Sequence, residues 1–464
     1  MFLAVLVSAG AQQMNKQIGA ENKKYSSWQI DEMIIVGKYD SLTIGVTKNY
    51  KSIAQNVQVI AFDDNMNMVH SVDIPDTKLD HAEMASIFEG KIYILIYHYK
   101  KWDGSYEYNR AVLDAKTLTL IGEPNTVFSY KHKSSEEHYL WASQSPDGLL
   151  AAIIDISVVE RKDKYAAVEI LLDEEMNIEW QRDYPIYWLS NMMVTNDGEI
   201  ITLGRSKGKG ANKIYFSVID QNNGIDISQQ TSVAIEKTDL ICYRDNKILA
   251  VGFGNDPENK REIKYFGISA DTKTSTVNID YKTVTNNDKC VFDGVDLGKK
   301  LDPRKNYYLK LKNCKETDYG AVATLVNYPN KYDINIVGML VFAIDKNGSI
   351  IWNKMVRNNL FSKYEPTKLF YALCVEGSDT YLVGTESHKG PATYTVDKKI
   401  NKQNLNSGGK GIAIYHFDAN GSVTKKLDIL DKPMFFGKHV KKIGDEYVGF
   451  ITTVNGVSMI KFRF

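Results

Sequence analysis

The residue types that carry hydrolytic chemistry are present in this sequence, but they do not fall into a recognisable catalytic pattern. The eight histidines include no His-x-x-x-His pair, and no Gly-x-Ser-x-Gly sequence places a serine nucleophile on a sharp turn. Carboxylates such as Asp155, Glu160 and Glu169 could form the acid and base of a glycosidase, but such a pair is defined by its separation in space. An enzyme acting on carbohydrate is therefore kept as an alternative, and we predict no catalytic residues.

A group of aromatic and basic residues gives a stronger chemical signal, and that signal is for binding. Residues 97–106 alternate tyrosine, lysine and tryptophan around a glycine turn, and residues 129–139 add further tyrosines and histidines. Exposed aromatic rings beside hydrogen-bonding side chains can stack on sugar rings or peptide side chains. The predicted ligand-binding residues are Tyr99, Lys101, Trp102, Tyr106, Tyr130, His132, Tyr139 and Tyr394. In an alternative interpretation, Tyr97 and Tyr99 belong to a strand end and only Trp102 and Tyr106 are free.

The elements that must position these residues repeat along the chain. A β-prone run at residues 57–64 ends in an acidic turn and re-enters as a second run at residues 68–74. Variants of this hairpin recur around Asp114, Asp173, Asp220, Asp271, Asp345 and Asp418, which makes seven hairpins in all. Self-similarity at a period of roughly 40–60 residues, built only of strands, indicates an all-β fold of the β-propeller type.

The count of hairpins predicts the number of blades. Each hairpin forms the outer two strands of a four-stranded blade, and the inner two strands precede it. Three further strands follow the seventh hairpin, at residues 439–443, 447–451 and 457–462. Tyr25–Ile30 would supply the missing fourth strand, because a blade shared by both ends of the chain leaves no open edge. We therefore predict eight four-stranded blades closed by N- and C-terminal strands, with seven blades as the alternative.

The predicted propeller occupies residues 12–464 as a single domain with two insertions. The insertion near residues 286–306 is acidic and could be a lid or a calcium loop, but its spacing does not match an EF-hand. A solvated insertion is the default interpretation, so we predict no metal site and no cofactor. The second insertion, residues 388–410, has a length that is uncommon unless the segment is functional or disordered.

The N-terminus has the features of an export signal. Residues 2–7 are apolar and residues 8–12 end in small residues, which predicts a signal peptide over residues 1–11 with cleavage after Ala11. An N-terminal strand buried in a sheet is the alternative. We therefore expect a periplasmic, extracellular or cell-surface protein. No other apolar run approaches the roughly 20 residues that cross a bilayer, so no membrane span is predicted.

Charge and cysteine content limit the possible partners and cross-links. The 57 basic and 57 acidic residues balance, which disfavours a nucleic-acid partner because no global positive field exists. After export the four cysteines could be oxidised. Cys290 and Cys314 bracket an irregular segment and form a possible disulfide, whereas Cys242 and Cys374 lie in apolar strand patterns and should pack as small hydrophobic residues.

The chain resembles exported bacterial β-propeller proteins of the kind common in Bacteroidota. The resemblance lies in the turns Asp345-Lys346-Asn347-Gly348 and Asp418-Ala419-Asn420-Gly421 and in the signal end Ala9-Gly10-Ala11-Gln12. It is generic and implies no catalytic residues. We expect non-catalytic recognition of a glycan, peptide or partner protein in the cell envelope. A structural subunit of an envelope assembly is a further alternative, which a wide apolar surface patch would favour; clustered carboxylates or histidines at the channel mouth would favour an enzyme.

Overall fold

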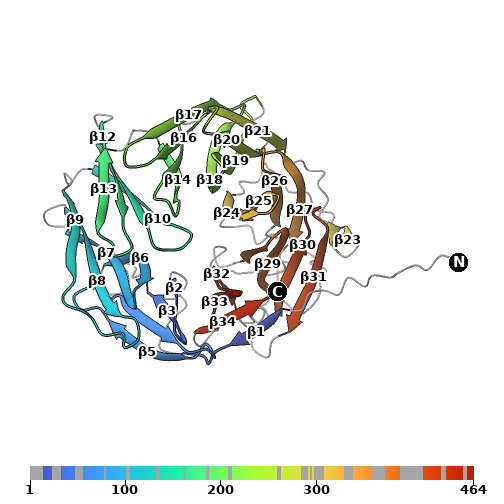
Figure 1. The fold of residues 1–464 in the computed structure, drawn as a ribbon. Coiled ribbons are helices and arrows are strands. Elements are labelled where there is room, and N and C mark those ends of the chain that lie inside the picture. Colours follow the sequence, from blue (N-terminus) through green and yellow to red (C-terminus); the bar gives the residue numbers. More distant parts are fainter. Residues whose placement is uncertain are drawn as a thin grey trace, which may run out of the picture.

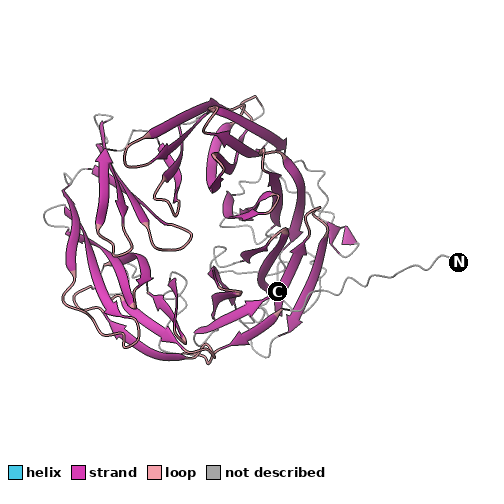
Figure 2. Ribbon diagram, in the orientation of Figure 1, coloured by secondary structure: helices cyan, strands magenta, loops and turns pink. Residues whose placement is uncertain are grey.

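The structure of the chain is a computed structural model. The residues that the structure describes are 14–22, 33–47, 56–77, 80–100, 105–131, 136–159, 164–183, 188–206, 212–258, 263–283, 291–292, 295–296, 308–328, 338–357, 371–386, 411–429, 435–452 and 457–464. Every regular element in these ranges is a β-strand (Figure 2). Accordingly, these ranges hold no helix with the length and apolar character needed to pass through a membrane.

Eight four-stranded antiparallel sheets stand in a ring around a central channel (Figure 1). Blade one contains β2 (Ile34–Tyr39), β3 (Leu42–Val46), β4 (Gln58–Phe62) and β5 (Met68–Asp73). Blade two contains β6 (His81–Phe88), β7 (Lys91–Lys100), β8 (Ser105–Asp114) and β9 (Asn125–Lys131). Blade three contains β10 (Glu136–Gln144), β11 (Ala151–Val159), β12 (Lys164–Leu172) and β13 (Ile178–Asp183). Blade four contains β14 (Trp188–Val194), β15 (Ile200–Arg205), β16 (Lys213–Ile219) and β17 (Gly224–Gln230).

The second half of the ring repeats this plan. Blade five contains β18 (Ala234–Arg244), β19 (Lys247–Asn255), β20 (Ile263–Asp271) and β21 (Thr276–Thr283). Blade six contains β24 (Tyr308–Thr317), β25 (Gly320–Tyr328), β26 (Gly338–Asp345) and β27 (Ile350–Arg357). Blade seven contains β28 (Tyr371–Glu376), β29 (Asp379–Glu386), β30 (Gly411–Phe417) and β31 (Val423–Ile429). Blade eight contains β32 (Phe435–Ile443), β33 (Glu446–Thr452), β34 (Val457–Arg463) and β1 (Asn15–Ile18).

The last blade closes the ring with strands from both ends of the chain, which confirms the predicted eight-bladed propeller. The closing strand is β1, which pairs antiparallel with β34 from Asn15 opposite Arg463 to Ile18 opposite Ile460. The prediction that Tyr25–Ile30 supplies this strand was therefore wrong, and those residues lie outside the described ranges. An outermost strand needs little apolar character, so the polar β1 gave a weaker sequence signal than the aromatic segment that follows it.

Apolar side chains fill the spaces between neighbouring blades. One cluster joins Ile44 and Val59 of blade one to Ile92 and Leu113 of blade two, all fully buried. Because each blade packs on two neighbours, its middle strands are apolar on both faces, which explains the near-continuous apolar runs. The buried Cys242 and Cys374 belong to such clusters, as predicted.

The seven acidic hairpins lie between the third and fourth strands of blades one to seven, as the repeat predicted. In each turn an aspartate Oδ1 accepts a hydrogen bond from a backbone N–H three or four residues later, which fixes the turn locally. The donors are Asn67, Thr117, Asn177, Asn223, Thr274, Ser349 and Ser422. These bonds favour the ionised carboxylate and lower the pKa of Asp114, Asp220 and Asp271.

Several of these turns also bind the preceding blade. Ser86 Oγ in blade two donates to the carbonyl of Glu174 in the blade-three turn, at 3.2 Å. Trp352 Nε1 in blade six donates to the carbonyl of Ala419 in the blade-seven turn, at 3.1 Å. At the closure, the N–H of Ala20 donates to Asn67 Oδ1 of blade one, at 2.8 Å. The repeated turns therefore connect blades as well as strands.

The two predicted insertions and the possible disulfide fall largely outside the described residues. Within the first insertion, β22 (Val291–Phe292) and β23 (Val295–Asp296) form a short hairpin, and β23 lies at the outer rim of the ring (Figure 1). Cys314 lies inside β24 and is a free cysteine, so the possible bridge to Cys290 is not formed. The Sγ of Cys314 donates instead to Asp239 Oδ2 in blade five, at 3.7 Å.

A buried ion pair joins two neighbouring strands of blade three, β12 and β13. The Glu169 side chain is fully buried, and its Oε2 accepts a hydrogen bond from Arg182 Nε at 3.0 Å. Glu169 Oε1 is buried with no hydrogen-bond partner among the described residues. Burial disfavours the carboxylate more than Arg182 favours it, and this raises the Glu169 pKa from 4.5 to about 7.

We expect the Glu169→Gln substitution to change how stability depends on pH. Between pH 4.5 and about 7 the folded chain holds a proton that the unfolded chain has lost, so this group's contribution to stability falls as pH rises. Glutamine does not titrate, so it avoids this loss. The free energy of unfolding of the variant, relative to that of the wild type, should therefore rise by on the order of 3 kcal/mol from pH 4 to pH 8. Denaturant unfolding of both proteins at the two pH values measures it. If the free energies of unfolding of the two proteins differ by the same amount at both pH values, the raised pKa of Glu169 is contradicted.

Candidate binding site

The predicted aromatic residues come from one end of blades two and three. In an antiparallel meander, the connection from the second to the third strand and the connection to the next blade emerge at the same end. Residues 101–104 join β7 to β8 and residues 132–135 join β9 to β10, so the sequence prediction placed both connections correctly on one face. Lys101, Trp102, His132 and Tyr394 lie outside the described residues.

Strand pairing gathers tyrosines at this end of blade two. Tyr106 pairs with Tyr99 on one side and with Tyr130 on the other. The ring of Tyr106 is half-buried and stacks on Tyr97, with a centroid distance of 5.4 Å. Tyr99 and Tyr106 therefore both belong to strands, and the connection between them is shorter than the sequence indicated.

Further aromatic rings pack against Tyr97, between blades two and three. Tyr108 is fully buried, and its ring centroid lies 5.4 Å from that of Tyr97 and 5.6 Å from that of Phe128. Its hydroxyl donates to Asp155 Oδ2 of blade three at 3.3 Å. Burial raises the pKa of Tyr108, so the phenol remains a neutral donor. We call the rings of Tyr97, Tyr106, Tyr108 and Phe128 the aromatic layer.

Two of the carboxylates considered for glycosidase chemistry have structural positions instead. Asp155 is 2% exposed and accepts the Tyr108 hydroxyl, and Glu169 is buried against Arg182 on another interface of blade three. Glu160 lies outside the described residues. Tyr139 is partly buried against the apolar cluster between blades three and four, so the structure does not bring it to the aromatic layer.

The sequence reasoning missed a histidine–aspartate pair at the same end of blade two. Asp80, just before β6, is buried, and its Oδ1 lies 2.5 Å from Nδ1 of the half-buried His98. Burial raises the Asp80 pKa, while its contact with His98 acts in the opposite direction. The pair holds the imidazole in a fixed orientation. No local signal links the two residues, which are 18 positions apart.

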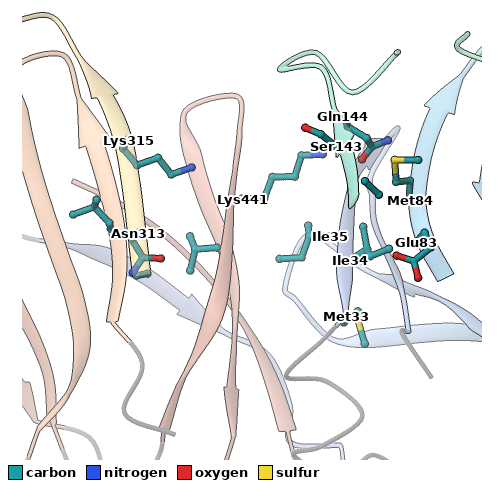
Figure 3. Close-up of a pocket in the computed structure, with 14 residues that line it drawn as sticks. Met33, Ile34, Ile35, Glu83, Met84, Ser143, Gln144, Asn313, Lys315 and Lys441 are labelled. Carbon is teal, nitrogen blue, oxygen red and sulfur yellow. The ribbon is translucent and has the colours of Figure 1, made fainter. Parts of the chain in front are cut away.

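A cavity of about 400 Å³ occupies the central channel (Figure 3). Its walls come from the innermost strands of six blades, β2, β6, β10, β24, β28 and β32, and from Met33. The polar side chains in the wall are those of Glu83, Ser143, Gln144, Asn313, Lys315 and Lys441. In the described part of the chain, no group of three or more His, Cys, Asp and Glu residues is placed to hold a metal ion.

β-Bulges explain why the strand pattern did not reveal this lining. The pairing register shifts between Ala82 and Met84 in β6 and between Leu311 and Asn313 in β24. A bulge adds a residue and reverses which side chains face each way. Glu83 lies within the first bulge, and Asn313 and Lys315 follow the second. Charged residues within the innermost strands were the only available signal.

Comparison with known proteins shows no relative by sequence: no protein-family model and no curated protein matches the chain. It is similar to the solved WD40 domain of SCAP from fission yeast, at 6% identity and a TM-score of 0.43, over 93% of this chain and 94% of that one. It is similar to the Dos1 propeller at 9% identity and a TM-score of 0.45, over 92% and 91% of the two chains.

A third similar structure is an acylaminoacyl peptidase from Pyrococcus horikoshii, at 10% identity and a TM-score of 0.40. The match covers 93% of this chain and 59% of the peptidase. At these identities and TM-scores none of the similarities carries an activity or a partner over to this chain. The strand pairing itself establishes that the chain is an eight-bladed β-propeller.

Proposed function

We propose that this protein is a non-catalytic recognition propeller that binds a glycan, a peptide or a protein partner at the end of blade two where residues 101–104 and 132–135 emerge. The observation that carries the proposal is the aromatic layer, which ends at that face with the half-buried ring of Tyr106. Rigid aromatic rings supply contact area at a low entropy cost, which suits them to binding.

The alternatives have less support from the described residues. Among the described residues, the charged side chains that line the channel cavity are Glu83, Lys315 and Lys441, so they include no cluster of carboxylates or histidines. Large hydrophobic side chains that are exposed in the described ranges are Val69, Ile121, Ile225 and Ile351. They lie on blades one, two, four and six, so these described residues form no wide patch of the kind that a structural subunit would present.

We also propose that the protein is exported to the periplasm or cell surface, on the basis of the signal-like residues 1–11. The partner would then belong to the cell envelope. Intact-mass measurement of the protein secreted by its native host is expected to show a chain that begins at Gln12. Retention of Met1 to Ala11 in the secreted form would overturn this part of the proposal.

The Trp102→Ala substitution should weaken binding with little effect on folding. Charged residues and a glycine flank Trp102, so its truncation should change stability by no more than about 0.5 kcal/mol. Truncation of a central tryptophan in an interface commonly costs upward of about 2 kcal/mol of binding energy. Glycan arrays and envelope-protein arrays, probed with both proteins, identify the ligand and measure the loss.

The control is Ile121→Ala, which removes an exposed apolar side chain from the same blade. Ile121 lies in the connection between β8 and β9, which emerges at the opposite end of the blade, so this variant should bind as the wild type does. If Trp102→Ala unfolds the protein, Trp102 belongs to the core. If it retains every ligand at full affinity, the binding face lies elsewhere.

A further inference from the structure

The cavity in the central channel carries an excess of positive charge. Lys315 of β24 and Lys441 of β32 face it from different blades, and Glu83 of β6 is the one carboxylate among the described residues of its wall (Figure 3). Lys315 is exposed, and its side chain has no hydrogen-bond or ion-pair partner among the described residues. Lys441 is half-buried, and its Nζ donates to the carbonyl of Val36 at 2.6 Å, which leaves two N–H groups.

Two amide side chains on opposite sides of the cavity are held in place (Figure 3). Asn313 Nδ2 donates to the carbonyl of Tyr371 at 3.0 Å, and Gln144 Nε2 donates to the carbonyl of Ala85 at 2.9 Å. Each of these hydrogen bonds joins two neighbouring blades, so the packing of the blades holds both amides in position. Each side chain keeps a carbonyl oxygen and a second N–H for other partners. Ser143, next to Gln144, adds a hydroxyl (Figure 3).

Aliphatic side chains complete the wall, among them Ile34, Ile35, Leu373 and Val440. The cavity volume of about 400 Å³ lies within the range of small-molecule sites, roughly 300–1,000 Å³. A ligand that fits this wall has one negative group, several hydroxyl groups that both donate and accept, and short apolar faces. A monosaccharide acid has all three features.

We propose that the central channel binds an acidic monosaccharide of the hexuronate class. The ammonium groups of Lys315 and Lys441 attract the carboxylate, and the sugar hydroxyls bond to Asn313, Gln144 and Ser143. Low-dielectric walls strengthen the attraction to the two cations. The site differs from the blade-two face, so this inference does not rest on the proposed function.

Calorimetric titration of the full chain with galacturonate, and separately with galactose, tests the charge requirement. The two sugars differ in bearing a carboxylate or a hydroxymethyl group. Because hydrogen bonds to charged groups are each worth about 1.5–3 kcal/mol, galacturonate should bind at least about tenfold more tightly. Absence of saturable galacturonate binding at millimolar concentration, or equal affinity for the two sugars, would overturn the proposal.

Two lysine variants test whether galacturonate binds in the central channel. Lys315→Met should weaken galacturonate binding about tenfold or more without loss of stability, because Lys315 has no partner to lose among the described residues. Lys354→Met, which neutralises an exposed lysine on the outer strand β27, is the matched control and should bind as the wild type does. If the two variants bind galacturonate equally, the anion binds outside the channel. Trp102→Ala should leave galacturonate binding unchanged, which separates failure here from failure of the proposed function.

Discussion

The Gly348→Ala substitution is expected to destabilise the ring far more than Gly148→Ala, although both glycines occupy the same place in a turn. Their φ angles are +81° and +77°, and the N–H of each donates to the carbonyl three residues earlier. In this left-handed region a side chain costs about 1–2 kcal/mol. A Cβ at Gly148 meets nothing within 4 Å, whereas one at Gly348 would lie 2.6 Å from the Ser269 nitrogen in blade five.

The difference between the two variants isolates the contact between blades. The backbone of Ser269 cannot rotate away from the new Cβ as a flexible side chain could. Blade six must therefore shift relative to blade five, and such overpacking costs about 1–3 kcal/mol. We expect Gly348→Ala to lose about 3–4 kcal/mol and Gly148→Ala about 1–2 kcal/mol. Denaturant unfolding of both variants beside the wild type measures this. Equal losses of unfolding free energy would show that the contact between the Asp345–Gly348 turn and blade five does not restrict the side chain at position 348.

The Asp345–Gly348 turn shows where local sequence reasoning succeeds. The sequence Asp345-Lys346-Asn347-Gly348 specifies its own turn, because the aspartate caps backbone N–H groups within four residues and glycine accepts the positive φ. Seven aspartate-capped turns, with the three strands that follow the last of them, were sufficient to predict the hairpins and the eight-bladed ring. Their contacts with the preceding blade, such as that between Gly348 and Ser269, depend on residues 79 positions apart and have no local signature.

The candidate sites were predicted only in part, for related reasons. Tyr99, Tyr106 and Tyr130 could be placed on one face because strand order determines which connections share an end. Tyr139 was grouped with them, but its place in the alternation along β10 directs it toward blade four. The channel residues Glu83 and Lys315 could not be found, because bulges in β6 and β24 reset that alternation.

Removing β1 is expected to open the ring. We compare a chain that begins at Met14 with one that lacks residues 1–22 and has an added initiator methionine. Met14 is 4% exposed in the cluster between blades seven and eight, and Gly19 N–H donates to the carbonyl of Met459 at 3.0 Å. Loss of a buried methionine costs about 2–5 kcal/mol, and each lost hydrogen bond about 0.5–1.5 kcal/mol. The shorter chain should therefore be destabilised by at least about 5 kcal/mol.

The shorter chain should also associate, because loss of β1 leaves β34 as an unpaired edge from Ile460 to Arg463. It further removes the hydrogen bond from Gln17 Nε2 to Asn65 Oδ1, which ties blade eight to blade one at 2.8 Å. Thermal unfolding and light scattering over a range of concentrations follow both effects. The chain that begins at Met14 is the control, because it keeps every β1 contact. A shorter chain that stays monomeric with an unchanged Tm would show that three strands suffice to close the eighth blade.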